Sequence, residues 1–379
     1  MSDKASHILF LPRWYPNKFD PMFGLFIQHH AKVAALNHNI SVVYVHFCAQ
    51  AKDIEFQVNN NTILEISVYI LRSSNPIINL FNWLKAYQKG IKKAIELNGK
   101  IDLTHVHILT RLGLIAYYLN IFKGIPYIIT EHWSRYQEGR DFKGFLRKLA
   151  TKLVAKKAKG LTTPSRHLQS AMLKHGIKAN YSVLSNTVSE QLFYPEIHEA
   201  NPVFQILHIS CFEEASKNMS GILKAMQELK KHAKFKLSMI GTGIDFIATL
   251  KLAKQFDVLD VVEFPGLLQG EELASRVRKA DLLIMFSNYE NMPVVISEAL
   301  CCGIPVVSSN VGGIKEILHP DFGILVPKND QNAFVQAILQ VMKNPDFYQK
   351  DKIASMASNI WHEKAVSEQL ENLYAHALK

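Results

Sequence analysis

Cysteine is scarce in this sequence. The 379 residues contain four, at Cys48, Cys211, Cys301 and Cys302. Their spacing matches neither a zinc-binding pattern nor the dense disulfide framework of a small secreted protein. We therefore expect a protein of the reducing cytoplasm, and we predict no metal site.

Long apolar runs are also missing. No stretch approaches the roughly 20 apolar residues of a membrane-spanning helix, and residues 1–6 lack the basic and apolar regions of a signal peptide. The short apolar run at residues 7–11 is better interpreted as a first β-strand. With 48% hydrophobic residues, the chain is long enough for two globular domains with separate cores.

Acidic residues are scarce in the first half. Residues 1–195 contain 25 Lys and Arg but 11 Asp and Glu, a balance of +14, whereas the remaining residues contain 18 and 22, a balance of −4. A surface this basic can attract nucleic acid, anionic lipid or a phosphorylated acceptor. Charge alone does not choose among these partners.

Two basic stretches, residues 83–100 and 142–159, carry much of the excess. Their basic residues recur at helical spacing, as in a helix that lies on an anionic membrane, where each contributes roughly 1 kcal/mol. One amphipathic helix more often covers a core, but two together favour peripheral contact with the inner face of a membrane. Neither stretch alternates basic and aromatic residues in a regular pattern for base stacking, which argues against nucleic acid.

Strand-like and helix-like segments alternate through the first half, as in a doubly wound α/β domain. Gly24 opens a predicted helix over residues 25–36, and His105, His107 and His132 come at the ends of later strands. We see no third metal ligand at a convincing spacing, so His105 and His107 are interpreted as structural. The predicted strands cover residues 7–12, 40–47, 63–71, 102–108, 125–131, 160–163 and 181–184.

A polar segment with two prolines, residues 195–202, separates this half from a second alternating region. We place the interdomain linker there, which predicts domains at residues 1–195 and 203–359. Lys217 follows the first strand of the second domain, where an ammonium group can neutralise charge that develops on a diphosphate leaving group. Gly241 and Phe264 close the next two strands.

Two glutamates, Glu290 and Glu298, stand at the start of a predicted helix between buried strands at residues 281–287 and 304–310. Strands joined in this way are parallel, and ligands bind beyond their carboxyl ends. The free N–H groups at the start of the helix can hold a phosphate, and a carboxylate can accept two hydrogen bonds from a diol. A nucleotide sugar offers both groups, although such a pair in isolation is usually a turn cap and a solvated helix residue.

This region resembles the glycosyltransferases of family 4. The resemblance rests on Ser287-Asn-Tyr-Glu290, Ser297-Glu298-Ala-Leu, Gly303-Ile-Pro-Val-Val307 and Gly312-Gly313-Ile-Lys-Glu316. It is strong over residues 204–318 and looser before them. It implies the GT-B fold, in which two Rossmann-like doubly wound α/β domains face a central cleft and a C-terminal helix, here residues 360–379, crosses back to the N-terminal acceptor domain.

The resemblance also implies roles for individual residues. Glu290 would contact the transferred sugar, Glu298 the ribose of the donor and Lys217 the diphosphate, while His132 would lie near the sugar. Catalysis is thus assigned to Glu290, His132 and Lys217, with no metal and no other cofactor. The predicted donor-binding residues are Gly24, Ser210, Lys217, Gly241, Phe264, Glu290, Asn291, Met292, Val294 and Glu298.

Two positions depart from the family pattern. The family usually has Gly-Arg where this chain has Ser210-Cys211, and Thr187 replaces a glycine before the linker. Without the arginine, the charge of the diphosphate falls to Lys217, the helix N-termini and the glycine turns, or to another cation such as Arg13. Donor identity and rate are the properties that this change affects.

These features and the resemblance predict a glycosyltransferase that moves a sugar from a nucleotide diphosphate sugar to an acceptor hydroxyl. The resemblance implies that the transfer retains the anomeric configuration. The expected acceptor is a saccharide or lipid-linked saccharide, used in the synthesis of a cell-surface polysaccharide or glycolipid. The expected location of the protein is the cytoplasm. Two alternatives stay open. One is a nucleotide-sugar epimerase or hydrolase on the same fold, and the other is a basic protein that binds lipid or nucleic acid and has lost catalysis.

Overall fold

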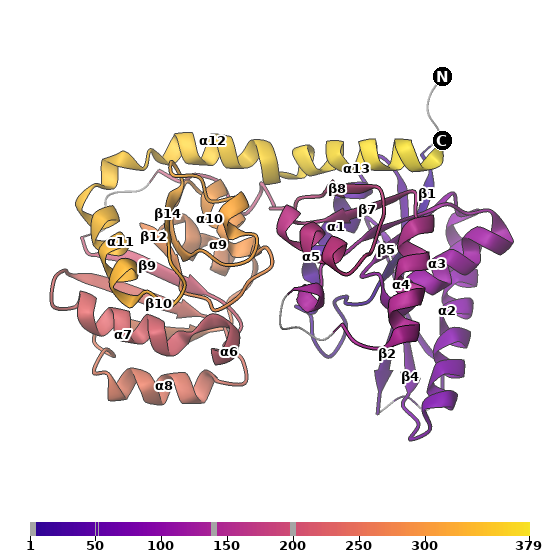
Figure 1. The fold of residues 1–379 in the computed structure, drawn as a ribbon, viewed down its shortest axis with the longest axis horizontal. Helices are drawn as coiled ribbons and strands as arrows, with labels where there is room; N and C mark the ends of the chain where they lie inside the picture. Colours follow the sequence, from indigo (N-terminus) through magenta and orange to yellow (C-terminus); the bar gives the residue numbers. More distant parts are fainter. Residues whose placement is uncertain (1–4, 50, 52, 138–141, 198–201) are drawn as a thin grey trace. The chain divides into compact units, whose positions relative to one another are not determined.

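The structure, a computed structural model, describes residues 5–49, 51, 53–137, 142–197 and 202–379. Residues 1–4 and four residues of the expected linker, 198–201, lie outside the described residues. The chain divides into two compact units (Figure 1). The first comprises Met1–Pro164, Leu168–Thr187 and Val366–Lys379, and the second Ser165–His167 and Val188–Ala365. Within the described ranges, no helix combines the length and hydropathy needed to span a bilayer.

An eight-stranded sheet forms the centre of the first unit, in the order β3-β4-β2-β1-β5-β6-β7-β8. Seven strands correspond to the predicted ones, whereas β3 is not among them and runs antiparallel to β4. All six residues of β3 are exposed, so it lacks the burial pattern by which a strand is recognised. The strands are β1 (His7–Pro12), β2 (Asn39–Cys48), β3 (Glu55–Asn60), β4 (Leu64–Leu71), β5 (Leu103–His107), β6 (Tyr127–Thr130), β7 (Gly160–Thr163) and β8 (Tyr181–Val183).

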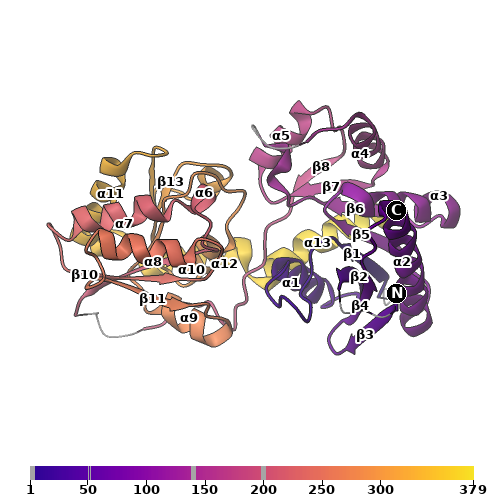
Figure 2. The ribbon, with the colours of Figure 1, turned by 90° about the horizontal axis from the view of Figure 1, so that it is seen from below.

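Helices cover both faces of this sheet (Figure 2). Along β1, Leu9 and Leu11 enter one core, with residues of α2, α3 and α4, while Ile8 and Phe10 enter another, with residues of α1 and α13. This burial on both faces explains why the strands are continuous apolar runs. The helices are α1 (Leu25–Ala34), α2 (Pro76–Asn98), α3 (Thr110–Lys123), α4 (Phe145–Lys157), α5 (Arg166–Lys174) and α13 (Glu363–Leu378).

The basic helix α2 begins well before residue 83, where the charge pattern starts. Asn75 caps it by accepting hydrogen bonds from the backbone N–H groups of Ile77 and Ile78, and Pro76 occupies the first turn. The second basic helix, α4, leaves its first two residues, Phe145 and Leu146, 79% and 77% exposed. The apolar start of α4 therefore does not pack into the core.

A sheet of six parallel strands forms the second unit, in the order β11-β10-β9-β12-β13-β14. The chain moves outward from β9 to β11 and then returns to the other side of β9, so the strand order reverses between β9 and β12. The strands are β9 (Phe204–Ile209), β10 (Phe235–Ile240), β11 (Val262–Gly266), β12 (Leu282–Met285), β13 (Val306–Ser309) and β14 (Gly323–Val326). The helices are α6 (Glu214–Lys217), α7 (Met219–Leu229), α8 (Phe246–Gln255), α9 (Gly270–Arg278), α10 (Val294–Cys301), α11 (Gln331–Lys343) and α12 (Lys350–Trp361).

The C-terminal helix α13 packs on the first unit. Val366, Leu370 and Tyr374 are fully buried in its core. The hydroxyl of Tyr374 hydrogen-bonds with Nδ1 of His105 at 3.0 Å. The first unit is therefore assembled from segments that lie on both sides of the second unit in the sequence.

Candidate active site

Lys217 and Glu290 lie where the strand order of the second unit reverses. Lys217 ends α6, the short helix that follows β9, and Glu290 lies in the loop between β12 and α10. Because β9 and β12 are adjacent and parallel, both loops leave the same edge of the sheet. This is the edge at which doubly wound sheets bind ligands.

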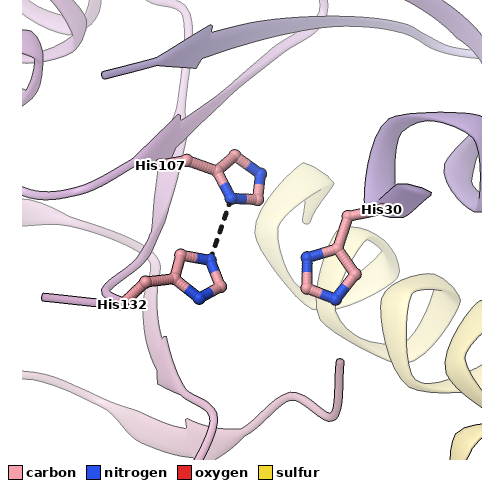
Figure 3. A group of neighbouring side chains, drawn as sticks. All are labelled: His30, His107 and His132. Carbon is pink, nitrogen blue, oxygen red and sulfur yellow. Dashed lines mark hydrogen bonds between the residues drawn. The ribbon is translucent and has the colours of Figure 1, made fainter. Parts of the chain in front are cut away.

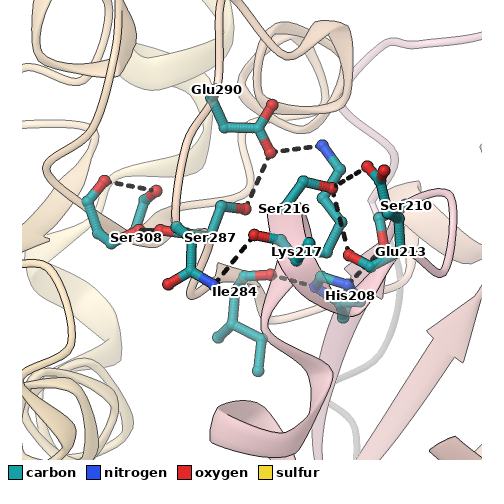
Figure 4. A network of polar contacts seen from close by, with 12 residues as sticks. His208, Ser210, Glu213, Ser216, Lys217, Ile284, Ser287, Glu290 and Ser308 are labelled. Atoms are coloured by element: carbon teal, nitrogen blue, oxygen red, sulfur yellow. Dashed lines mark hydrogen bonds and ion pairs between the residues drawn. The ribbon is translucent and has the colours of Figure 1, made fainter. Parts of the chain in front are cut away.

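The side chains of Lys217 and Glu290 form an ion pair (Figure 4). Nζ of Lys217 lies 2.5 Å from Oε1 of Glu290, and the hydroxyl of Ser287 donates a hydrogen bond to the same oxygen at 2.8 Å. The side chains of the ion pair are only 15% and 8% exposed. Removing either partner would leave the other charge largely buried, which is costly.

A network of hydrogen bonds fixes the loop that carries Glu290. The hydroxyl of Ser309 on β13 donates to the carbonyl of Ser287 at 2.7 Å. On the other side, the N–H of Asn288 donates to the carbonyl of Ser216 at 2.8 Å. The loop is thus tied both to β13 and to the helix that carries Lys217, which holds the ion pair in one geometry.

Gly312 contacts the backbone of Glu290. It has φ 58°, and a Cβ at this position would lie 2.0 Å from the carbonyl oxygen of Glu290. Gly313 donates its N–H to the carbonyl of Asn291 at 3.0 Å. The two glycines of the family motif therefore clamp the loop, and Met292 and Val294 follow it half-buried at the start of α10.

Ser210 and Gly241 follow the neighbouring strands β9 and β10 and touch each other. Gly241 has φ 133°, and a Cβ there would lie 1.9 Å from the carbonyl oxygen of Ser210, so only glycine fits. His208 donates from Nδ1 to the carbonyl of Ile284 at 3.0 Å, which leaves Nε2 to accept from the hydroxyl of Ser210 at 2.7 Å. Burial lowers the pKa of His208 to about 4, so this ring is neutral at pH 7.

Phe264 lies one strand further from the ion pair. It belongs to β11, at the edge of the sheet, and its half-buried ring packs edge-on against Phe212 with centroids 6.4 Å apart. Cys211, which replaces the family arginine, is exposed in the loop after β9. Neither side chain therefore belongs to the network around Glu290.

Glu298 lies half-buried on α10, and burial raises the pKa of its carboxyl to about 7. Among the described residues, this carboxylate makes no hydrogen bond or ion pair. Burial removes water from a carboxylate, and without a new hydrogen-bond donor its ionised form is destabilised relative to its protonated form. Hydrogen-bond donors from a ligand would offset that cost.

Three histidines lie close together in the first unit. The sequence predicts only two of them at one sheet edge, because these two come at the ends of neighbouring strands. His30 lies on α1, His107 ends β5 and His132 follows β6 (Figure 3). The rings of His107 and His132 stack, and Nδ1 of His107 lies 3.3 Å from Nε2 of His132. Burial lowers the pKa of all three rings, so they are neutral at pH 7. Neutral imidazoles offer lone pairs for a hydrogen bond or a metal ion.

Glu131 positions His132, a role that the sequence analysis missed. Its carboxylate accepts the backbone N–H groups of His132 at 2.9 Å, Trp133 at 2.8 Å and Leu109 at 3.0 Å. Burial raises its pKa, and these hydrogen bonds oppose the rise. An acidic residue directly after a buried strand is the available signal in the sequence.

Gly24 and Arg13 also belong to the first unit. Gly24 caps α1 with φ 72°, and a Cβ there would lie 2.4 Å from the backbone of Trp14. The guanidinium of Arg13 lies over the ring of Trp133, 4.5 Å from its centroid. The backbone of the loop that follows β1 therefore leaves no room for a side chain at Gly24.

A pocket of about 240 Å³ opens in the first unit between that loop and strands β3 and β4. In its lining, Glu65 accepts hydrogen bonds from Tyr15 at 2.6 Å, Gln28 at 2.7 Å and Asn59 at 2.9 Å. Its lining is mostly amide, hydroxyl and aromatic, and includes Tyr15, Asn17, Lys18, Gln28, Gln57, Asn59, Glu65, Ser67 and Tyr69. Nothing in the sequence indicates this pocket, because β3 carries no recognisable burial pattern.

Family models match both halves of the chain. The model described as glycosyl transferases group 1 matches residues 195–359, and the model of glycosyltransferase family 4 matches residues 27–192. Together they cover most of the sequence.

Two curated relatives show how far the similarity extends. The N-acetyl-alpha-D-glucosaminyl L-malate synthase of Bacillus anthracis is 25% identical over 177 residues, so the match spans 46% of each chain. An uncharacterized glycosyltransferase of Methanocaldococcus jannaschii is 26% identical over 311 residues, 78% of this chain and 82% of the relative.

Solved structures share the fold. A sucrose-phosphate synthase from Thermosynechococcus elongatus superposes with a TM-score of 0.77 at 18% identity, over 98% of both chains. Anabaena HepE, solved in complex with UDP and glucose, gives 0.72 at 15% identity, over 98% of this chain and 99% of the other. The two Rossmann-like units therefore form a GT-B fold, as the sequence predicts. With both halves matched by family models, the chain belongs to the group 1 glycosyltransferases of family 4.

Proposed function

We propose that the chain transfers a sugar from a nucleoside diphosphate sugar to a hydroxyl of a saccharide acceptor, with retention of the anomeric configuration. The observation that carries the proposal is the Lys217–Glu290 pair at the strand-order reversal of the second unit. A cation and a carboxylate at one place match a substrate whose diphosphate adjoins the hydroxyls of a sugar. The UDP and glucose bound by Anabaena HepE support a donor of this class.

In this mechanism Lys217 stabilises the negative charge that grows on the diphosphate while the bond between sugar and phosphate oxygen breaks. Glu290 accepts hydrogen bonds from sugar hydroxyls and holds the sugar in place. The acceptor hydroxyl attacks on the face from which the diphosphate leaves, and its proton passes to a phosphate oxygen. The protein therefore needs no base of raised pKa, and no step passes through a metal ion.

The remaining predicted residues bind the donor around this centre. Glu298 accepts hydrogen bonds from the ribose, which would satisfy a carboxylate that lacks a partner among the described residues. Ser210, Gly241 and Phe264 border the nucleotide, and Asn291, Met292 and Val294 shape the start of α10. From the first unit, we assign His132 to the transferred sugar and Gly24 to the donor phosphate or the acceptor.

The pocket beside Glu65 is our candidate for acceptor binding. Glu65 already accepts three hydrogen bonds, so its donors are held in fixed positions. Gln28 and Asn59 each use their NH₂ group for Glu65, which leaves their carbonyl oxygens to accept from sugar hydroxyls. Tyr69 adds an aromatic side chain to the lining. This chemistry suits a saccharide or lipid-linked saccharide of a cell-surface polysaccharide or glycolipid.

We further propose that the protein works in the cytoplasm, on the inner face of a membrane. Helix α4 exposes Phe145, Leu146 and Leu149 by 79%, 77% and 56%, beside the basic residues Arg147 and Lys148. Apolar side chains next to basic ones favour an anionic lipid surface. Helix α2 provides the second basic stretch.

The proposal is tested by thermal unfolding with UDP-, GDP- and ADP-sugars, each with and without Mg²⁺. One class of nucleotide sugar should raise the melting temperature of the wild-type protein without the ion. Glu298→Ala should reduce that rise, whereas Glu272→Ala, an exposed glutamate of α9, should leave it unchanged. Stabilisation by no nucleotide sugar, together with binding of vesicles or RNA, would support the non-catalytic binder instead.

Product analysis separates transfer from the other enzyme class. An epimerase or hydrolase would isomerise the donor or release free sugar without any acceptor. The transferase should consume the donor rapidly only when a saccharide acceptor is added, and the product should keep the anomeric configuration of the donor.

A further inference from the structure

His30, His107 and His132 bring one ring nitrogen each to within 4.8 Å of one another (Figure 3). They come from three elements that are distant in the sequence: a helix, the end of a strand and the loop after the next strand. His30 and His107 are fully buried, and His132 is 7% exposed. In the part of the chain that the structure describes, no other group of three His, Cys, Asp or Glu residues gathers its ligand atoms this closely.

The tautomer of His30 is set by a backbone carbonyl. Nε2 lies 2.9 Å from the carbonyl oxygen of Ser185, which can only accept, so Nε2 carries the proton. Nδ1 is then left with a lone pair, and this buried atom has no hydrogen-bond partner. Figure 3 shows one nitrogen of His30 facing the other two rings. A carbonyl that orients the far side of an imidazole is the usual support for a metal-binding histidine.

The other two histidines are already at ligand spacing. Zinc binds imidazole nitrogen at about 2.0–2.1 Å, so two nitrogens on one tetrahedral ion are about 3.3–3.4 Å apart. Nδ1 of His107 and Nε2 of His132 are 3.3 Å apart and share a hydrogen bond, so one of these two nitrogens carries a proton. An ion that binds both nitrogens would replace this hydrogen bond, and the protonated ring would carry its proton on its other nitrogen. The third nitrogen is within 4.8 Å, so a small side-chain movement would complete three ligands.

We propose that His30, His107 and His132 form a binding site for Zn²⁺ or another borderline divalent transition metal ion. Three neutral imidazoles with no thiolate or carboxylate leave the fourth position of a tetrahedral ion open to water or to an oxygen ligand. Bound there, the ion would join α1 to the ends of β5 and β6. The site shares His132 with the sugar contact proposed above, so a bound ion would compete with that contact, and the transfer step itself uses no metal ion.

The test measures metal binding by the full-length chain, purified without a polyhistidine tag and freed of metal with a chelator. Co²⁺ is titrated first, because a tetrahedral nitrogen-coordinated Co²⁺ absorbs strongly in the visible range, and Zn²⁺ is then added to displace it. We expect one equivalent of Co²⁺ with this spectrum, its displacement by one equivalent of Zn²⁺, and a rise in melting temperature with each ion.

Neighbouring histidines provide a matched control. His30→Ala and His107→Ala should each lower the affinity for Zn²⁺ by more than about 100-fold. His29→Ala changes a half-buried histidine of the same helix that lies outside the cluster, and it should keep the wild-type affinity. Equal affinity in wild type and His30→Ala would overturn the proposal, as would the absence of binding at micromolar Zn²⁺.

X-ray absorption of the wild-type protein loaded with one equivalent of Zn²⁺ decides the question even if a variant fails to fold. Three imidazole ligands would support the site. A shell of oxygen ligands, or of fewer than three imidazoles, would refute it.

Discussion

The two units place different chemistry at equivalent places. In each, the strand order reverses next to the first strand, between β1 and β5 in one sheet and between β9 and β12 in the other. The first unit gathers neutral imidazoles there, at His107 and His132, while the second gathers opposite charges, at Lys217 and Glu290. A shared architecture thus provides the location, and the residues that end the strands decide the ligand.

This difference suggests a division of labour. A fixed ion pair suits the ionic donor, whereas the amide-lined pocket of the first unit suits an uncharged, polyhydroxylated partner. Variants that change residues of one unit at a time should therefore have separable effects on donor binding and on transfer.

The largest effect is expected from the ion pair. Lys217→Met and Glu290→Gln should each lower the rate of transfer by about 100- to 1,000-fold, because each removes a group that acts on the reacting centre. Steady-state rates with the donor found by thermal unfolding measure this. Since the two residues act as one unit, the double variant should lose much less than the product of the single effects.

Lys230→Met is the matched control for Lys217→Met. Lys230 pairs with Asp260 at 2.8 Å on the surface of the same unit, and such exposed pairs contribute little to stability. A similar loss of transfer in Lys230→Met and Lys217→Met would show that the loss is not specific to the ion pair of Lys217 and Glu290.

His132→Ala tests the contribution of the first unit. We expect transfer to fall by about 100-fold through misplacement of the sugar, while the rise in melting temperature caused by the nucleotide stays as in wild type. His376→Ala, an exposed histidine on α13, should change neither. Loss of the nucleotide effect in His132→Ala would contradict the separation between the units.

Gly312→Ala should destabilise the second unit by about 1–3 kcal/mol, because the new Cβ would lie 2.0 Å from the carbonyl oxygen of Glu290 at φ 58°. Urea unfolding measures this loss. Gly124→Ala shares a positive φ of 67° but meets no atom within 4 Å, so it should cost less. Equal losses would mean that backbone conformation, and not contact with Glu290, is what requires glycine at position 312.

The smallest effect is a dependence on pH. Burial raises the pKa of Glu298 from 4.5 to about 7 in the folded chain, so its contribution to stability is lost as the pH rises through 7. A ribose that donates to the ionised carboxylate should bind more tightly as the pH rises from 6 to 8, by at most about tenfold per unit. Calorimetric titration of nucleotide measures this, and Glu298→Gln should flatten the profile. A wild-type affinity that falls over this range would exclude the ribose role.

Much of the second unit could be predicted from the sequence. Its central strands are continuous buried runs, and the loops after β9 and β12 carry Lys217 and Glu290, so the sequence places both residues at one edge of the sheet. Ser287 precedes Glu290 by three residues, but nothing in the sequence shows that its hydroxyl binds Oε1.

The first unit was less predictable. His30 lies on a helix far from His107 and His132 in the sequence, so only packing brings the three together. Strand β3 has six exposed residues, and without it the pocket around Glu65 has no visible signature. Sites built from helix faces and edge strands leave weaker patterns than sites at the ends of buried strands.

The packing of α13 has a consequence for how the protein is made. A ribosome completes residues 188–365 before it reaches Val366, Leu370 and Tyr374, which fill the core of the first unit and reach His105. The first unit therefore stays without part of its core until α13 has emerged, although most of its residues are synthesised before the second unit. During that interval the first unit exposes apolar surface of the kind that makes incompletely folded chains prone to aggregate.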